Sequence, residues 1–81
     1  MTDLGRAMAL SAAEVVRSAR LSAGLTQAQL AQRAGVTQSV ISAYESGRRE
    51  PALSTLSRLV GAAGLRLEVQ IGRPLGEGYP S

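Results

Sequence analysis

Apolar residues recur at helical spacing along the first two thirds of the chain, and turn residues divide them into separate segments. Ser11 and Glu14 match the S-x-x-E capping box, in which the hydroxyl and the carboxylate each satisfy a free backbone amide. We therefore expect a helix from Ser11 to about Ala23. One face of this helix carries Ala13, Val16, Arg20 and Ala23. The buried stripe thus contains an arginine, which needs a partner.

A second, short helix is predicted directly after the first. Gly24 ends the first helix, and Thr26 with Gln29 forms another capping box. This box opens a helix over residues 27 to about 34. Its inner face consists of Leu30, Ala31 and Ala34.

A third helix follows after a tight turn. Gly35 can adopt the positive φ that such a turn requires, and Thr37 can cap a helix that runs from Gln38 to about Ser46. Gly47 supplies its stop. Two short helices joined so closely must cross steeply. Ile41 and Tyr44 should point inward, whereas the outward positions are Gln38, Ser39, Ser42 and Ser46.

A fourth helix and a strand are predicted in the rest of the chain. The inner stripe of the helix is Leu53, Leu56, Leu59, Val60 and Ala63, and Gly64 ends it. Residues 65–71 then alternate strictly between apolar and polar, which predicts a half-buried strand with an apolar face of Leu65, Leu67, Val69 and Ile71. Because one strand cannot form a sheet, we expect it to pair with its copy in a second chain. Pairing with residues 1–10 of the same chain is the alternative.

The whole chain is predicted to form one mainly α domain of four to five helices with one C-terminal β-strand. Residues 1–10 form an N-terminal arm whose structure the pattern leaves undecided, because Gly5 interrupts its apolar residues. Residues 11–64 form the helical domain, and residues 65–71 form the dimerisation strand. The tail, residues 72–81, is rich in glycine and proline and is expected to be flexible.

The composition argues against most enzyme classes. The chain has no cysteine and no histidine, so it lacks thiolate ligands, disulfides and the commonest general base. We expect no catalytic residues, no metal and no cofactor. No segment approaches the ~18 uninterrupted apolar residues of a membrane span, so we expect no membrane association and a cytoplasmic location.

The charge is consistent with a nucleic-acid partner but does not establish one. All nine basic residues are arginines, and the formal net charge is +3. Arginine suits forked hydrogen bonding to phosphate. Because domains without a polyanionic partner can carry a similar charge, the spacing of residues must decide.

That spacing resembles the helix-turn-helix signature of the phage-repressor/Cro (XRE) family. The similar segment is L-T-Q-A-Q-L-A-Q-R-A-G-V-T-Q-S-V-I-S-A-Y-E-S-G, residues 25–47. With the flanking helices, the resemblance covers residues 11–64. It implies a compact helical fold, sequence-specific binding to double-stranded DNA, and dimers.

The third helix then becomes the recognition helix, whose N-terminal end contacts base edges. Gln38 is the best base-contact candidate, because its amide can bond bidentately to adenine N6 and N7. Ser39 and Ser42 can donate or accept hydrogen bonds, and Ser46 lies on the same outward face. The methyl of Thr37 could touch a thymine methyl. The solvated face of an ordinary helix is the alternative.

Other positions are assigned to DNA contacts around this helix. Gln27 resembles the phosphate-contacting position of the family, and helix N-terminal amides would add to that site. Arg48 and Arg49 would reach flanking phosphates, with a solubilising loop as the alternative. The chain departs from the family at Ala43, which replaces a longer polar residue of many members. Alanine can offer only contact with a thymine methyl.

Glu45 supplies the partner that the buried arginine needs. It follows Ile41 by four residues and so lies beside the inward stripe of its helix. Matching positions in the family form an internal salt bridge. We therefore predict a partly buried, structural Arg20–Glu45 pair.

The leading functional hypothesis is a homodimeric transcriptional repressor that binds a two-fold operator. The strand after the fourth helix also resembles the layout of HipB-like antitoxins, which repress their own operon and bind a toxin protein. In that case the tail would be a toxin-contacting segment. A protein-binding module without operator recognition is the alternative of a different class.

Overall fold

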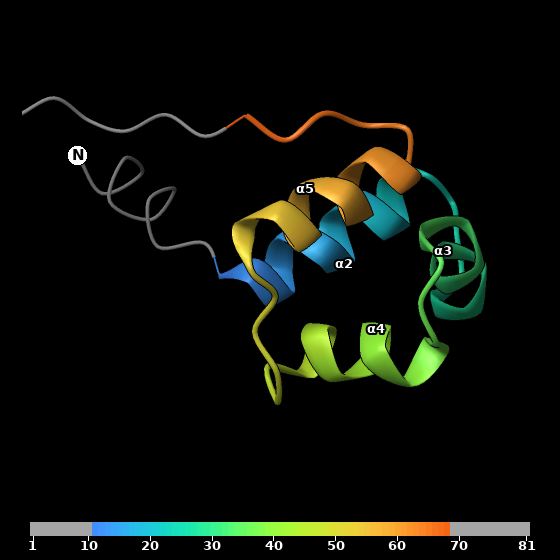
Figure 1. Ribbon diagram of the computed structural model, residues 1–81. Helices are drawn as coiled ribbons and strands as arrows, with labels where there is room; N and C mark the ends of the chain where they lie inside the picture. Colours follow the sequence, from blue (N-terminus) through green and yellow to red (C-terminus); the bar gives the residue numbers. More distant parts are fainter. Residues whose placement is uncertain (1–10, 69–81) are drawn as a thin grey trace, which may run out of the picture.

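The computed structural model describes residues 11–68 and consists of four helices in that range (Figure 1). They are α2 (Ala12–Ser22), α3 (Gln27–Ala34), α4 (Gln38–Ser46) and α5 (Leu53–Ala62). The predicted mainly α fold is confirmed, and each predicted helix is present. No helix among the described residues is both long and apolar enough to cross a membrane.

The N-terminal caps hold the first three helices as predicted. Ser11 accepts from the Glu14 amide at 3.2 Å while Glu14 accepts from the Ser11 amide at 3.1 Å. Thr26 and Gln29 form the same reciprocal pair at 3.0 and 2.8 Å. Thr37 caps α4, with its hydroxyl accepting from the Val40 amide at 3.3 Å. These bonds satisfy amides that have no partner inside the helix.

The turn between α3 and α4 depends on Gly35. This residue has φ +74°, in the left-handed region that other residues rarely adopt. The amide of Val36 donates to the carbonyl of Ala31 at 3.0 Å, which completes a Schellman-type cap. A Cβ at Gly35 would meet no atom within 4 Å, so glycine is required for the backbone angle and not for space.

The core lies where the four helices meet. α2 packs against α4 and α5, and α3 packs against the same two helices. The most deeply buried side chains are Val16, Leu30, Ile41 and Leu59, and Tyr44 is also in the core. The predicted core differs from the structure at two positions. Leu53, which was expected to point inward, is 60% exposed because it is the first residue of α5, and Ala19, which the predicted stripe omitted, is buried.

The segment after α5 has no strand over residues 65–68. A strand needs a hydrogen-bonding neighbour, and the described part of the single chain offers none. Leu65 is 46% exposed, whereas Leu67 is half-buried against the core. Val69 and Ile71 of the predicted dimerisation strand lie outside the described residues, as do the arm, residues 1–10, and the tail, residues 72–81.

Candidate nucleic-acid interface

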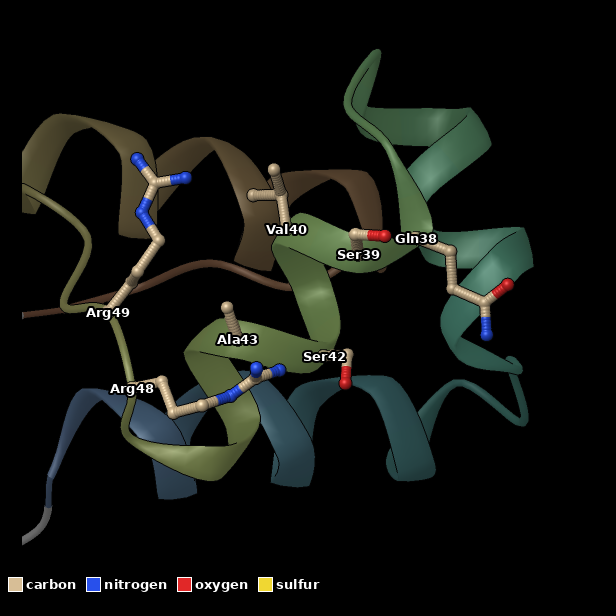
Figure 2. Close-up of a pocket in the computed structure, with 7 residues that line it drawn as sticks. All are labelled: Gln38, Ser39, Val40, Ser42, Ala43, Arg48 and Arg49. Carbon is tan, nitrogen blue, oxygen red and sulfur yellow. The ribbon is translucent and has the colours of Figure 1, made fainter.

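The outer side of α4 forms an open hollow, which we call the recognition hollow (Figure 2). Its volume is about 440 Å³. The lining residues come from α4 and the loop that follows it: Gln38, Ser39, Val40, Ser42, Ala43, Arg48 and Arg49. Six of these seven were predicted to contact DNA, and the fold brings them together on one surface.

The polar groups of the hollow are available to a ligand. Gln38 and Ser39 are exposed, and Ser42 is half-buried. Figure 2 shows the Gln38 amide at the N-terminal end of α4, extending away from the helix. This is the end of a recognition helix that approaches base edges.

The floor of the hollow is apolar. Ala43 is buried and Val40 is half-buried, and both line the hollow between the polar groups. Sequence reasoning assigned Ala43 to this surface but missed Val40, because an apolar residue next to Ile41 was not considered as a surface group. Together the two side chains offer methyl groups of the kind that contact a thymine methyl.

Thr37 lies next to the hollow and has a structural role. Its side chain is exposed, but its hydroxyl oxygen accepts the capping bond from the Val40 amide. The methyl group remains free to contact a ligand.

Ser46 and Arg48 form one hydrogen-bonded unit at the C-terminal end of α4. Ser46 Oγ donates to the Ala43 carbonyl at 3.1 Å and accepts from Arg48 Nε at 3.0 Å. The Arg48 amide donates to the same carbonyl at 3.0 Å. Ser46 is not among the residues that line the hollow, but it holds Arg48, which is.

Arg49 is held in a different way. Its guanidinium carbon lies 5.8 Å from the centre of the Tyr44 ring, within the range of a cation–π interaction. Tyr44 is buried in the core, as its spacing predicted. The two arginines thus leave the same loop but rest against different groups.

Comparison with known proteins identifies the fold family. A helix-turn-helix family model matches residues 16–70, which is more than half of the chain. The chain belongs to the phage-repressor/Cro-type helix-turn-helix family. It is a DNA-binding regulator domain, and the predicted family resemblance is confirmed.

The individual relatives have names of several kinds. The chain is 44% identical over 50 residues to an uncharacterized HTH-type transcriptional regulator of Methanothermobacter thermautotrophicus, covering 62% of this chain and 72% of that protein. It is 39% identical over 67 residues to multiprotein-bridging factor 1 of Schizosaccharomyces pombe, covering 82% and 45%. It is 35% identical over 57 residues to the immunity repressor protein of Bacillus phage phi105, covering 70% and 40%. The chain spans about half the length of the first curated relatives it matches. No significant match to a solved structure was found.

An ion pair fixes the recognition helix of this helix-turn-helix domain against α2. Arg20 Nε donates to Glu45 Oε2 at 2.7 Å, and Arg20 Nη2 donates to Oε1 at 3.0 Å, so the contact is bidentate. Arg20 Nη1 also donates to the Leu25 carbonyl at 2.9 Å. The side chains are only 13% and 5% exposed. The structure therefore brings together the two residues that were predicted to pair.

Gln27 is turned toward this ion pair. The side chain is half-buried, and its Nε2 donates to Glu45 Oε1 at 3.2 Å. The expected phosphate contact would therefore have to use the second amide hydrogen. Sequence reasoning missed the bond to Glu45 because the two residues are 18 positions apart.

The same contacts set the ionisation of the pair. Burial by itself would raise the pKa of Glu45, but hydrogen bonds from Arg20 and Gln27, with the charges of Arg20 and Arg17, lower it below its ordinary value. The hydrogen bond to Glu45 raises the pKa of Arg20. Both groups are consequently charged at neutral pH.

Proposed function

We propose that this chain is a homodimeric transcriptional repressor in which each subunit places α4 in the major groove of a two-fold operator. The observation that carries the proposal is the recognition hollow, where exposed hydrogen-bonding side chains surround an apolar floor on the outer side of α4. The major groove presents donors, acceptors and thymine methyls in patterns that distinguish the base pairs.

Each side chain of the hollow is assigned a role by its chemistry. Gln38 bonds bidentately to adenine, and Ser39 and Ser42 donate to or accept from neighbouring base edges. Val40 and Ala43 contact thymine methyls. The free amide hydrogen of Gln27 and the N-terminal amides of α3 bind a backbone phosphate, which fixes the register of the helix.

The dimer is proposed to form through residues 65–71. Leu65 is half-exposed, although an apolar side chain at this position would gain free energy from burial. Pairing with the same segment of a second chain would give this segment strand hydrogen bonds and would cover that side chain. The two recognition helices would then reach half-sites about 34 Å apart, which is one turn of DNA.

Selection of preferred sites from random duplex DNA tests this function. We expect an enriched two-fold motif whose half-sites are one helical turn apart, and an affinity that falls steeply with salt. Absence of any enriched site, with only weak salt-sensitive binding, would overturn operator recognition. An enriched motif without two-fold symmetry would overturn the dimer alone.

Protein binding is the second candidate function, and one feature favours it. A mainly apolar groove of about 320 Å³, the α2–α5 groove, is lined by five apolar residues and four polar ones: Val15, Ala19, Val60, Leu65 and Leu67, with Glu14, Ser18, Ser22 and Arg66. No residue of α4 lines this groove. One relative is named multiprotein-bridging factor. A toxin is the partner that the antitoxin hypothesis requires.

Pull-down with the full chain distinguishes these possibilities. A toxin partner should be retained by the intact protein and lost when residues 72–81 are removed. Unchanged partner binding after this deletion would reject the tail as the contact segment. Binding that instead depends on Val15, which lines the α2–α5 groove but lies outside the proposed dimer segment, would assign the partner to the groove.

A further inference from the structure

Arg48 is turned toward the recognition helix and not away from it. Figure 2 shows its side chain running beneath Ala43, with the guanidinium toward Ser42. The residue also lines the recognition hollow together with Ser42 and Ala43. An arginine that only contacts flanking phosphate would have no need to lie along the base-reading face.

Two contacts hold Arg48 in this position. Its backbone amide donates to the Ala43 carbonyl at 3.0 Å, which fixes the start of the side chain. Its Nε donates to Ser46 Oγ at 3.0 Å, which fixes the head. Ser46 accepts this bond through an oxygen lone pair, while its own hydrogen is donated to the Ala43 carbonyl at 3.1 Å. Ser46 therefore orients the guanidinium.

The free edge of that guanidinium has the geometry of a base reader. Nη1 and Nη2 carry four N–H donors, and no acceptor within residues 11–68 is bonded to them. Two parallel donors match the O6 and N7 acceptors of guanine in the major groove, which is the commonest specific arginine contact. The guanidinium of Arg49 instead lies over Tyr44.

We propose that Arg48 reads a guanine in each half-site, with Ser46 as its positioning residue, whereas Arg49 contacts the DNA backbone. This inference rests on the proposed operator binding. It assigns to Arg48 a role different from the phosphate contact that the sequence predicts. It also specifies one base pair of the operator, next to the base pairs that Ser42 and Ala43 approach.

Competition binding with the selected site and its single-base variants tests the proposal. We expect Arg48→Ala to remove the preference for guanine at one position of each half-site, with a loss of about tenfold to a hundredfold on the selected site. On the variants without that guanine, Arg48→Ala and wild type should bind alike. Arg49→Ala should lower affinity equally on all sites and reduce the salt slope by about 1.

A modified base provides a second, independent readout. Replacing the guanine by 7-deazaguanine removes the N7 acceptor, so it should weaken wild type and leave Arg48→Ala unchanged. Ser46→Ala should lose part of the guanine preference, and Ser46→Thr, which keeps a hydroxyl, should restore it. Thermal unfolding of each variant shows whether the domain is intact.

The possible failures are distinct. A uniform loss for Arg48→Ala on every site, or indifference of wild type to 7-deazaguanine, would overturn guanine reading while operator binding stands. If no site is enriched in the selection, the proposed function fails, and this inference fails with it.

Discussion

The recognition hollow and the α2–α5 groove are comparable in size but differ in what lines them. The hollow presents an amide, hydroxyls and guanidinium groups around a small apolar floor. The lining of the groove is mainly apolar and includes Val15, Val60, Leu65 and Leu67. Directional donors suit base edges, whereas methyl groups suit another protein surface. One small domain thus offers two surfaces with different kinds of partner.

The Arg20–Glu45 pair joins α4, which lines the hollow, to α2, which lines the groove, and breaking that pair should have the largest effect. Glu45→Ala leaves the Arg20 charge in a site where it is only 13% exposed, and we expect a loss of about 3 to 5 kcal/mol in the free energy of unfolding. Urea denaturation measures this. Glu50→Ala, which removes an exposed carboxylate, serves as the control and should cost under about 0.5 kcal/mol. A similarly small loss for Glu45→Ala would show that the pair does not hold α4 on α2.

The next largest effect is expected from disrupting the proposed dimer interface. Val69→Asp places a charge on the apolar face of the predicted strand, so we expect monomers by light scattering and operator affinity lower by at least about a hundredfold. Gln70→Asp, on the other face of the alternation, should leave the mass unchanged. A dimer that persists in Val69→Asp would show that residues 65–71 are not the interface.

Thr37 permits a finer test, because its hydroxyl caps α4 while its methyl is free. Thr37→Ala should lower the free energy of unfolding by about 1 kcal/mol through loss of the cap. Thr37→Ser should retain the cap and the stability, yet lose discrimination between thymine and uracil at the contacted base. If Thr37→Ser discriminates as wild type does, the methyl makes no base contact.

The smallest expected effect is the acid dependence of the ion pair. The pKa of Glu45 is lowered in the folded state, so its contribution to stability is complete above the ordinary value of 4.5 and declines as the pH falls through the folded-state pKa. The difference in stability between wild type and Glu45→Ala should therefore narrow below about pH 4.5. A difference that is constant from pH 7 to pH 3 would contradict the lowered pKa.

Most of the fold could be predicted from the sequence because its signals are local. The capping pairs at Ser11 and Thr26 each depend on residues three positions apart. Gly35 marks a turn because the backbone there has a positive φ, which glycine adopts readily. The exposure of Leu53 could not be predicted, since periodicity does not show whether the first residue of a helix reaches the core.

The site was predictable as a set of residues but not as a set of contacts. Gln38, Ser39 and Ser42 could be predicted to point outward, because the helical spacing of apolar residues identifies the outer face of α4. The bond from Gln27 to Glu45 and the orientation of Arg48 by Ser46 depend on tertiary packing or on side-chain rotamers. The periodicity of the sequence does not specify these contacts.

The most direct test of base reading by α4 is a full single-base specificity profile of Gln38→Ala. Gln32→Ala, an exposed glutamine on α3 outside the hollow, is the matched control. We expect Gln38→Ala to lose about tenfold to a hundredfold discrimination at one adenine of each half-site and to keep its other preferences, while Gln32→Ala matches wild type. If the two variants give the same profile as wild type, α4 does not read the operator through Gln38, and the proposed base contact is wrong.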